Sequence, residues 1–216
     1  MRIQALLSAI LAATEVVLRD RRAYLEAMTA LPVTPETTQH PAGLAWARDV
    51  AFPVAATAII VLAADVRMPL GLPGHRGLVW LTMLVAVALT ARRPQAVLAV
   101  GAASTAATLL LQSGPGPWAG ARYLGAAALL CLLTSRVPVR RWLVALAAAP
   151  IHLVALIIPI ATTLIGGHHL AVVGLGDKVV FHLGFGLIAG LLGWATAAVI
   201  DRAAPPDFRP ISSQPS

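Results

Sequence analysis

The stretch Leu70–Trp80 holds the densest group of residues that could take part in chemistry. It reads Leu-Gly-Leu-Pro-Gly-His-Arg-Gly-Leu-Val-Trp and lies between two strongly apolar runs. Glycine and proline interrupt regular structure, so we expect a loop or a broken helix start here. Two interpretations follow for His75 and Arg76. Either they belong to a turn at the level of lipid headgroups, or they belong to a loop that closes over a ligand.

Two other segments between apolar runs carry similar residues. Glycine-rich loops with aromatic and hydrogen-bonding side chains are typical of a lidded site for a small molecule. The candidate ligand-binding residues in and beside the three segments are His75, Arg76, Trp118, Arg122, Tyr123, His168, His169, Asp177, Lys178 and His182. We expect them to gather on one side of the protein.

Each candidate also has a purely structural interpretation. Arg122 can extend to lipid headgroups, and Trp80 and Trp118 fit an aromatic belt at the membrane interface. The adjacent pair His168–His169 is a weak signal for a metal, and we expect no metal site. The pair Asp177–Lys178 can form an ion pair with no further role.

The composition indicates a membrane protein. Of the 216 residues, 58% are hydrophobic and only 12% are charged, with a mean hydropathy of +0.81. A typical soluble domain has about 25% charged residues. The net charge of +7 is explained by basic residues at the ends of apolar runs, which is a feature of membrane topology. We therefore expect an all-α, polytopic membrane protein in a lipid bilayer, and no nucleic-acid partner.

Six apolar runs predict six transmembrane helices in a domain covering residues 47–202. The runs are approximately 50–66, 78–91, 95–111, 120–135, 142–165 and 179–200. His152 lies within the fifth run, where we expect a hydrogen bond between helices. Residues 1–46 are expected to form an N-terminal amphipathic helix and a linker, although a cytosolic helix packed on the domain fits the same pattern. Residues 203–216 are expected to be a disordered tail.

The basic residues predict the orientation. If six helices alternate in direction, 12 of the 16 Lys and Arg residues lie on the side of the two termini. The other four are Arg67, Arg76, Arg122 and Lys178. Because basic residues are enriched in cytoplasmic loops, we expect both termini of this multi-pass cell-membrane protein in the cytoplasm.

Familiar catalytic motifs are missing. The sequence has no phosphate-binding Gly-x-x-x-x-Gly-Lys-Ser/Thr, no His-Glu-x-x-His and no Gly-x-Ser-x-Gly. We therefore expect no enzyme activity, no cofactor and no ATP hydrolysis by this chain. An energy-coupled function would need another subunit. Cys131 is the sole cysteine, which excludes an intrachain disulfide.

Residues 50–202 resemble the substrate-binding (S) component of energy-coupling factor (ECF) transporters. The resemblance rests on six short helices, cytoplasmic termini, the loop Pro69–Gly77, and Ala51 and Ala55 on the first helix. It implies capture of a vitamin or related micronutrient from outside the cell. It also implies a transmembrane coupling subunit, on which Ala51 and Ala55 would dock, and two cytoplasmic ATPases. Pro53, between the two alanines, departs from a regular helix.

A different class of function also fits the sequence. A membrane scaffold or assembly protein with no transport substrate would use the N-terminal helix and the small-residue faces to organise partners. Co-purified proteins would separate the two classes, because ATPase subunits are expected only with a transporter.

The expected topology is testable by thiol labelling in a Cys131→Ala background. Ser113→Cys or Leu170→Cys should react with an impermeant thiol reagent in whole cells, because both loops are expected outside. Val139→Cys should react only after permeabilisation. The reverse labelling pattern would place the glycine-rich loops in the cytoplasm.

Overall fold

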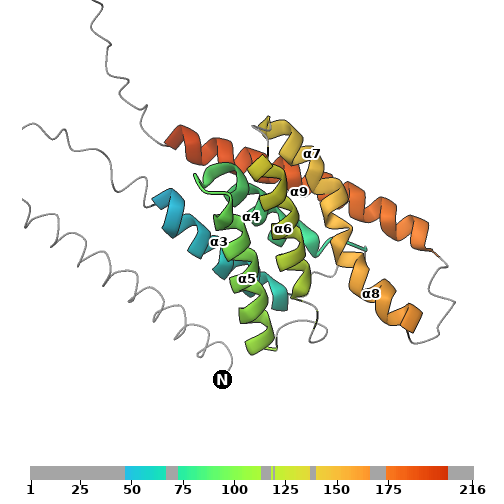
Figure 1. Cartoon of the computed structure of the whole chain (residues 1–216). Coiled ribbons are helices and arrows are strands. Elements are labelled where there is room, and N and C mark those ends of the chain that lie inside the picture. Colours follow the sequence, from blue (N-terminus) through green and yellow to red (C-terminus); the bar gives the residue numbers. More distant parts are fainter. Residues whose placement is uncertain are drawn as a thin grey trace, which may run out of the picture. The chain divides into compact units, whose positions relative to one another are not determined.

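The computed structural model describes residues 47–66, 73–112, 118, 120–136, 140–165 and 174–203 (Figure 1). The chain divides into two units, Met1–Trp46 and Ala47–Ser216, and all described residues belong to the second. Every regular element in the described ranges is a helix, so the all-α prediction is confirmed. The expected N-terminal helix and the segment 204–216 of the expected tail lie outside the described residues.

The helices follow the six apolar runs in order. They are a π-helical turn η1 (Ala47–Ala51), α3 (Phe52–Asp65), α4 (Gly77–Thr90), α5 (Gln95–Leu110), α6 (Ala121–Arg136), α7 (Arg141–His152), α8 (Val154–Ile165) and α9 (Leu175–Ala203). The fifth run therefore forms two helices, α7 and α8, with a turn at Leu153. Near this turn Pro150 has no backbone N–H to donate, and the N–H of Leu153 bonds to the Pro150 carbonyl at 3.1 Å.

Helix α9 is the one described helix that is long and apolar enough to cross a membrane. Its 29 residues correspond to a length of about 43 Å at 1.5 Å per residue, against about 30 Å for the hydrocarbon core of a bilayer. A core helix of a soluble protein can meet the same criteria, but only 28% of the apolar window of α9 is buried. The other apolar helices among the described residues are shorter.

Helix α4 is the centre of the helix bundle. It packs against α3, α5, α6, α7 and α9, and Figure 1 shows it enclosed by these neighbours. Its sequence is apolar on every side, which is typical of a fully buried helix. Its polar Thr82 is also buried, and the hydroxyl donates a hydrogen bond to the Ala189 carbonyl at 3.3 Å. That bond joins α4 to α9.

Helix α9 approaches α7 closely at two glycines. A Cβ on Gly186 would lie 2.8 Å from the Ala148 carbonyl oxygen, and a Cβ on Gly190 would overlap the Ala145 carbonyl. Glycines at this spacing let two helix backbones come together. The Gly186–Gly190 pair therefore serves packing inside this chain.

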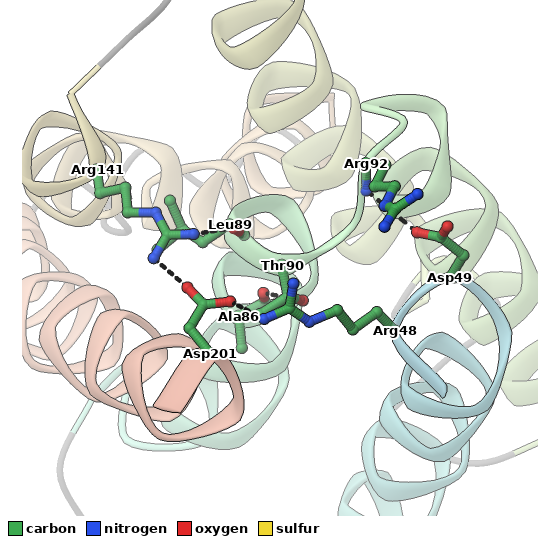
Figure 2. Close-up of polar contacts among 8 residues, drawn as sticks. All are labelled: Arg48, Asp49, Ala86, Leu89, Thr90, Arg92, Arg141 and Asp201. Carbon is green, nitrogen blue, oxygen red and sulfur yellow. Dashed lines mark hydrogen bonds and ion pairs between the residues drawn. The ribbon is translucent and has the colours of Figure 1, made fainter. Parts of the chain in front are cut away.

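Asp201, near the end of α9, joins several helices at one end of the bundle (Figure 2). Its carboxylate accepts a hydrogen bond from Arg48 of η1 at 2.5 Å and another from Arg141 of α7. Beside it, the carboxylate of Asp49 accepts a bond from the backbone N–H of Arg92 at 3.2 Å. We call this group of residues the Asp201 cluster, and it ties η1, α7 and α9 together with the turn that precedes α5.

The contacts also give the directions of three neighbouring helices. Arg141 at the start of α7 bonds to Asp201 at the end of α9 and to the Leu89 carbonyl at the end of α4. At the other end, His152 at the end of α7 bonds to the carbonyl of His182 in the second turn of α9. Helices α4 and α9 therefore run in the same direction, and α7 runs against them.

The packing of α9 on α7 predicts a difference between two glycines of the same helix. Gly190→Val should destabilise the protein by about 1–3 kcal/mol, because the added side chain meets backbone atoms of α7. Gly184→Val is the matched control, since a Cβ at Gly184 meets nothing within 4 Å. Thermal unfolding in detergent would compare them, and equal midpoints would contradict this close packing.

Candidate ligand-binding cavity

A cavity of about 260 Å³ lies at the end of the bundle away from the Asp201 cluster. It is lined by Pro73, Gly74, His75, Arg76, Gly77, Trp80, Arg122, His152, Ala155 and His182. These residues come from the turn before α4, the starts of α4, α6 and α9, and the junction of α7 with α8. Of the candidates predicted from the sequence, the cavity brings together His75, Arg76, Arg122 and His182.

The turn Pro73–Arg76 forms one wall of the cavity. Gly74 has a φ of +87°, a left-handed conformation that other residues adopt at a cost. Its carbonyl accepts a hydrogen bond from the N–H of Gly77 at 2.9 Å, which leads the turn into α4. A Cβ on Gly74 would also lie 3.2 Å from Nδ1 of His182. Glycine therefore serves both the shape of the turn and the approach of α9.

Two imidazole rings, from α7 and α9, form a second wall of the cavity beside this turn. The ring centroids of His152 and His182 lie 5.0 Å apart. Nδ1 of His152 lies 2.8 Å from the His182 carbonyl, and Nδ1 of His182 lies 2.7 Å from the Lys178 carbonyl. The expected hydrogen bond between helices at His152 is therefore confirmed. Because a carbonyl only accepts, Nδ1 carries the proton in each neutral ring, and Nε2 is then an acceptor.

Gly77 fixes the position of the His152 ring. A Cβ on Gly77 would overlap this imidazole, with Nε2 as its nearest atom. The Nε2 edge of His152 therefore faces the backbone of α4. None of the described glycines comes this close to the Nε2 edge of His182.

Arg122 and Tyr123 occupy the first turn of α6. Nη2 of Arg122 donates to the Tyr123 hydroxyl at 3.1 Å, and the guanidinium carbon lies 5.0 Å from the Tyr123 ring centroid. The Tyr123 ring meets Trp80 edge-on at 5.6 Å, and Trp80 meets His152 edge-on at 5.5 Å. A continuous row of rings therefore connects α6, α4 and α7 along the cavity.

The start of α6 is held by α5. The Thr105 hydroxyl of α5 lies 2.8 Å from the Gly120 carbonyl. A Cβ on Gly120 would lie 2.5 Å from Oγ1 of Thr108, and a Cβ on Gly101 would overlap the Ala127 methyl group. This close packing of α5 on α6 fixes the position of the start of α6, and therefore the position from which Arg122 reaches the cavity.

The cavity lining is rich in nitrogen donors and acceptors. It contains two guanidinium groups and three imidazoles, and no carboxylate is among its described residues. Nε of Arg122 is buried with no hydrogen-bond partner in the part of the chain that the structure describes. In the same part, neither Arg122 nor Arg76 is in an ion pair. Arg122 is half-buried and Arg76 is exposed. Because Nε of Arg122 is shielded from water with no counter-charge among the described residues, this site suits an anion.

Other predicted candidates lie elsewhere. Tyr123 lines a separate space of about 10 Å³ behind Arg122. Trp118 is 68% exposed, and the side chains of Asp177 and Lys178 are exposed at the start of α9. None of these four side chains lines the larger cavity. Lys178 contributes to it indirectly, through the carbonyl that orients His182.

Four other predicted residues remain, two histidines and the two alanines of the expected docking face. His168 and His169 lie outside the described residues. Ala51 is half-buried at the end of η1, and Ala55 is exposed on α3. Within the described residues, no group of three or more His, Cys, Asp or Glu could hold a metal ion.

Sequence analysis missed Trp80 and His152 as cavity residues. Trp80 is only 3% exposed, which rules out the aromatic-belt interpretation, because α4 lies at the centre of the bundle. His152 was expected to join helices, and it lines the cavity as well. The one signal in the sequence was the position of Trp80 at the end of the glycine-rich stretch.

The comparisons with known proteins found no matching family model, no matching curated protein and no matching solved structure. The geometry of the cavity therefore carries the functional argument.

The hydrogen bonds of the two imidazoles predict their tautomers. At about pH 8, where histidine is ordinarily neutral, His152 and His182 should both carry the proton on Nδ1. Nitrogen-15 spectra of histidine-labelled protein distinguish protonated from unprotonated ring nitrogens. His152→Gln and His182→Gln would assign the signals. A proton on Nε2 of either neutral ring would contradict the described hydrogen bonds.

Proposed function

We propose that this chain is the membrane-embedded substrate-capture subunit of an ECF-type uptake transporter for a small, anionic micronutrient. The observation that carries the proposal is the cavity. It gathers cationic and hydrogen-bonding side chains from segments far apart in the sequence, with no carboxylate among its described lining residues. Several of these segments are the ones from which the sequence predicted a ligand site.

The exposed surface supports a polytopic membrane protein. On α9, six large apolar side chains are between 37% and 49% exposed: Phe181, Leu187, Ile188, Leu191, Leu192 and Trp194. Large apolar side chains are also exposed on α3, α6 and α7. In water such a surface would favour aggregation, whereas in a bilayer it faces acyl chains. We infer six membrane segments, with α7 and α8 forming one of them.

The two ends of the bundle differ in their number of basic residues, because the proposed topology places 12 of the 16 Lys and Arg residues on the side of the termini. The Asp201 cluster gathers Arg48, Arg92 and Arg141 at one end (Figure 2), and the cavity lies at the other. Under the positive-inside rule the Asp201 cluster is cytoplasmic, so the cavity faces outward. That orientation suits a subunit that captures its ligand outside the cell.

Binding of an anion has a clear physical basis in this cavity. Each charge-assisted hydrogen bond contributes roughly 1.5–3 kcal/mol. Arg122 has a buried Nε with no partner among the described residues, and Arg76 lines the same space. A bound carboxylate or phosphate would supply the counter-charge that the described lining of the cavity lacks.

Uptake against a gradient would require partner subunits. The sequence has no ATP-binding motif of its own. A transmembrane coupling subunit and two cytoplasmic ATPases are the partners that the ECF resemblance implies. Ala55 is exposed on α3 and therefore open to a docking helix, whereas Ala51 is half-buried.

Substitution of Arg122 tests the capture function. In Arg122→Gln, the amount of the retained anionic molecule should fall about tenfold or more, because a charge-assisted bond is lost. Arg92→Gln is the matched control, since it removes the same charge at the other end of the bundle. Mass spectrometry of small molecules released from the purified proteins gives the readout, and thermal unfolding checks that both variants fold.

The outcome also separates transport from scaffolding. Co-purification of ATPase subunits, with a retained anion that depends on Arg122, would support the transporter. A retained cation or bare metal ion would contradict anion capture. A different set of partners, with no molecule retained by the wild-type protein, would favour the membrane scaffold.

A further inference from the structure

We propose that the captured ligand is a small, planar monocarboxylate that also carries a hydrogen-bond donor, an N–H or O–H group, away from its carboxylate. This inference rests on the proposed capture function and adds the size of the ligand, its shape and its second polar group. Four features of the cavity carry it: volume, aromatic lining, the Arg122 guanidinium and the orientation of the His182 ring.

The volume of the cavity limits the size of the ligand. A cavity of about 260 Å³ has room for about nine water molecules at about 30 Å³ each. It lies just below the range of about 300–1,000 Å³ that is typical of sites for drug-sized ligands. A ligand with about ten non-hydrogen atoms therefore fills it.

The lining favours a flat ligand. The rings of Trp80 and His152 are part of it and meet edge-on at 5.5 Å, with 3% and 1% of the two residues exposed. Gly77 holds the His152 ring against α4, so this wall cannot easily rearrange. Aromatic rings gain stabilisation from offset or edge-to-face contact with another ring. A planar, unsaturated ligand makes such contacts without disturbing the wall.

Arg122 binds the carboxylate. Its guanidinium is already oriented by the Tyr123 hydroxyl and ring, and its buried Nε has no partner among the described residues. A planar carboxylate matches the planar donors of arginine. Because Arg122 lies on α6, it anchors the ligand on the α6 side of the cavity.

His182 lies on a different wall and requires a donor. Its Nδ1–H is held by the Lys178 carbonyl, so Nε2 of the neutral ring is an acceptor. Nε2 of His152 faces Gly77, so of the two imidazoles on α7 and α9 it is His182 whose Nε2 can accept from the ligand. A fully ionised phosphate monoester has only acceptor oxygens on its phosphate group and would set one against this lone pair. A ligand with a carboxylate at one end and a hydrogen-bond donor at the other matches Arg122 on one wall and His182 on the other.

Two probes of nearly equal size test this inference: 4-hydroxybenzoate, which has the donor, and 4-fluorobenzoate, which lacks it. With the full chain in lipid nanodiscs, calorimetry should show 4-hydroxybenzoate binding about tenfold more tightly at neutral pH. In His182→Phe this preference should vanish, with 4-fluorobenzoate affinity kept within about twofold. His182→Gln, whose amide oxygen accepts, should keep part of the preference. Arg122→Gln should weaken both probes about tenfold or more.

Other results would overturn the inference. Equal binding of the two benzoates to wild-type protein, or inorganic phosphate binding as tightly as 4-hydroxybenzoate, would contradict the proposed ligand class. In that case a retained anion that still depends on Arg122 would leave the capture function standing. If the wild-type protein binds none of the three probes and retains no anion, the capture function itself fails. Arg92→Gln, far from the cavity, should bind both benzoates as the wild type does.

Discussion

The arrangement of this protein depends on how closely α9 lies against α7. At Gly190 a carbonyl of α7 occupies the space that any side chain would need, and Gly186 is nearly as crowded. The two backbones therefore fit in one register. In that register His152 reaches the His182 carbonyl, and the two imidazoles lie 5.0 Å apart at the end of the bundle. A larger residue at either glycine would separate the rings and widen the cavity that they line.

The arginine side chains at the two ends of the bundle have different kinds of partner. At one end, Asp201 pairs with both Arg48 and Arg141, so each of these cations has a carboxylate partner within the chain. At the other end, Arg122 is supported by the hydroxyl and ring of Tyr123, with no carboxylate partner among the described residues. An aromatic ring and one hydroxyl orient a guanidinium without neutralising it. The first end is suited to holding helices together, and the second is suited to binding an anion.

The sequence predicted the helices well and the cavity only in part. Helix positions follow from continuous apolar runs, which are local features. His75 and Arg122 were found because they lie in or next to glycine-rich segments. The place of Trp80 depends on α4 being enclosed by other helices, and that of His152 depends on Gly77 leaving room for its ring. Such contacts join residues distant in sequence, so no local pattern could reveal them.

The most direct measurement is an experimental structure of the purified protein, in lipid, together with the molecules that it retains. Our account predicts a planar, non-protein anion in the cavity between α4, α6 and α9. Its carboxylate should lie about 2.7–2.9 Å from the Arg122 guanidinium, the usual length of a charge-assisted hydrogen bond. A cavity that holds only water, with Arg122 paired to a carboxylate of the chain itself, would contradict the account.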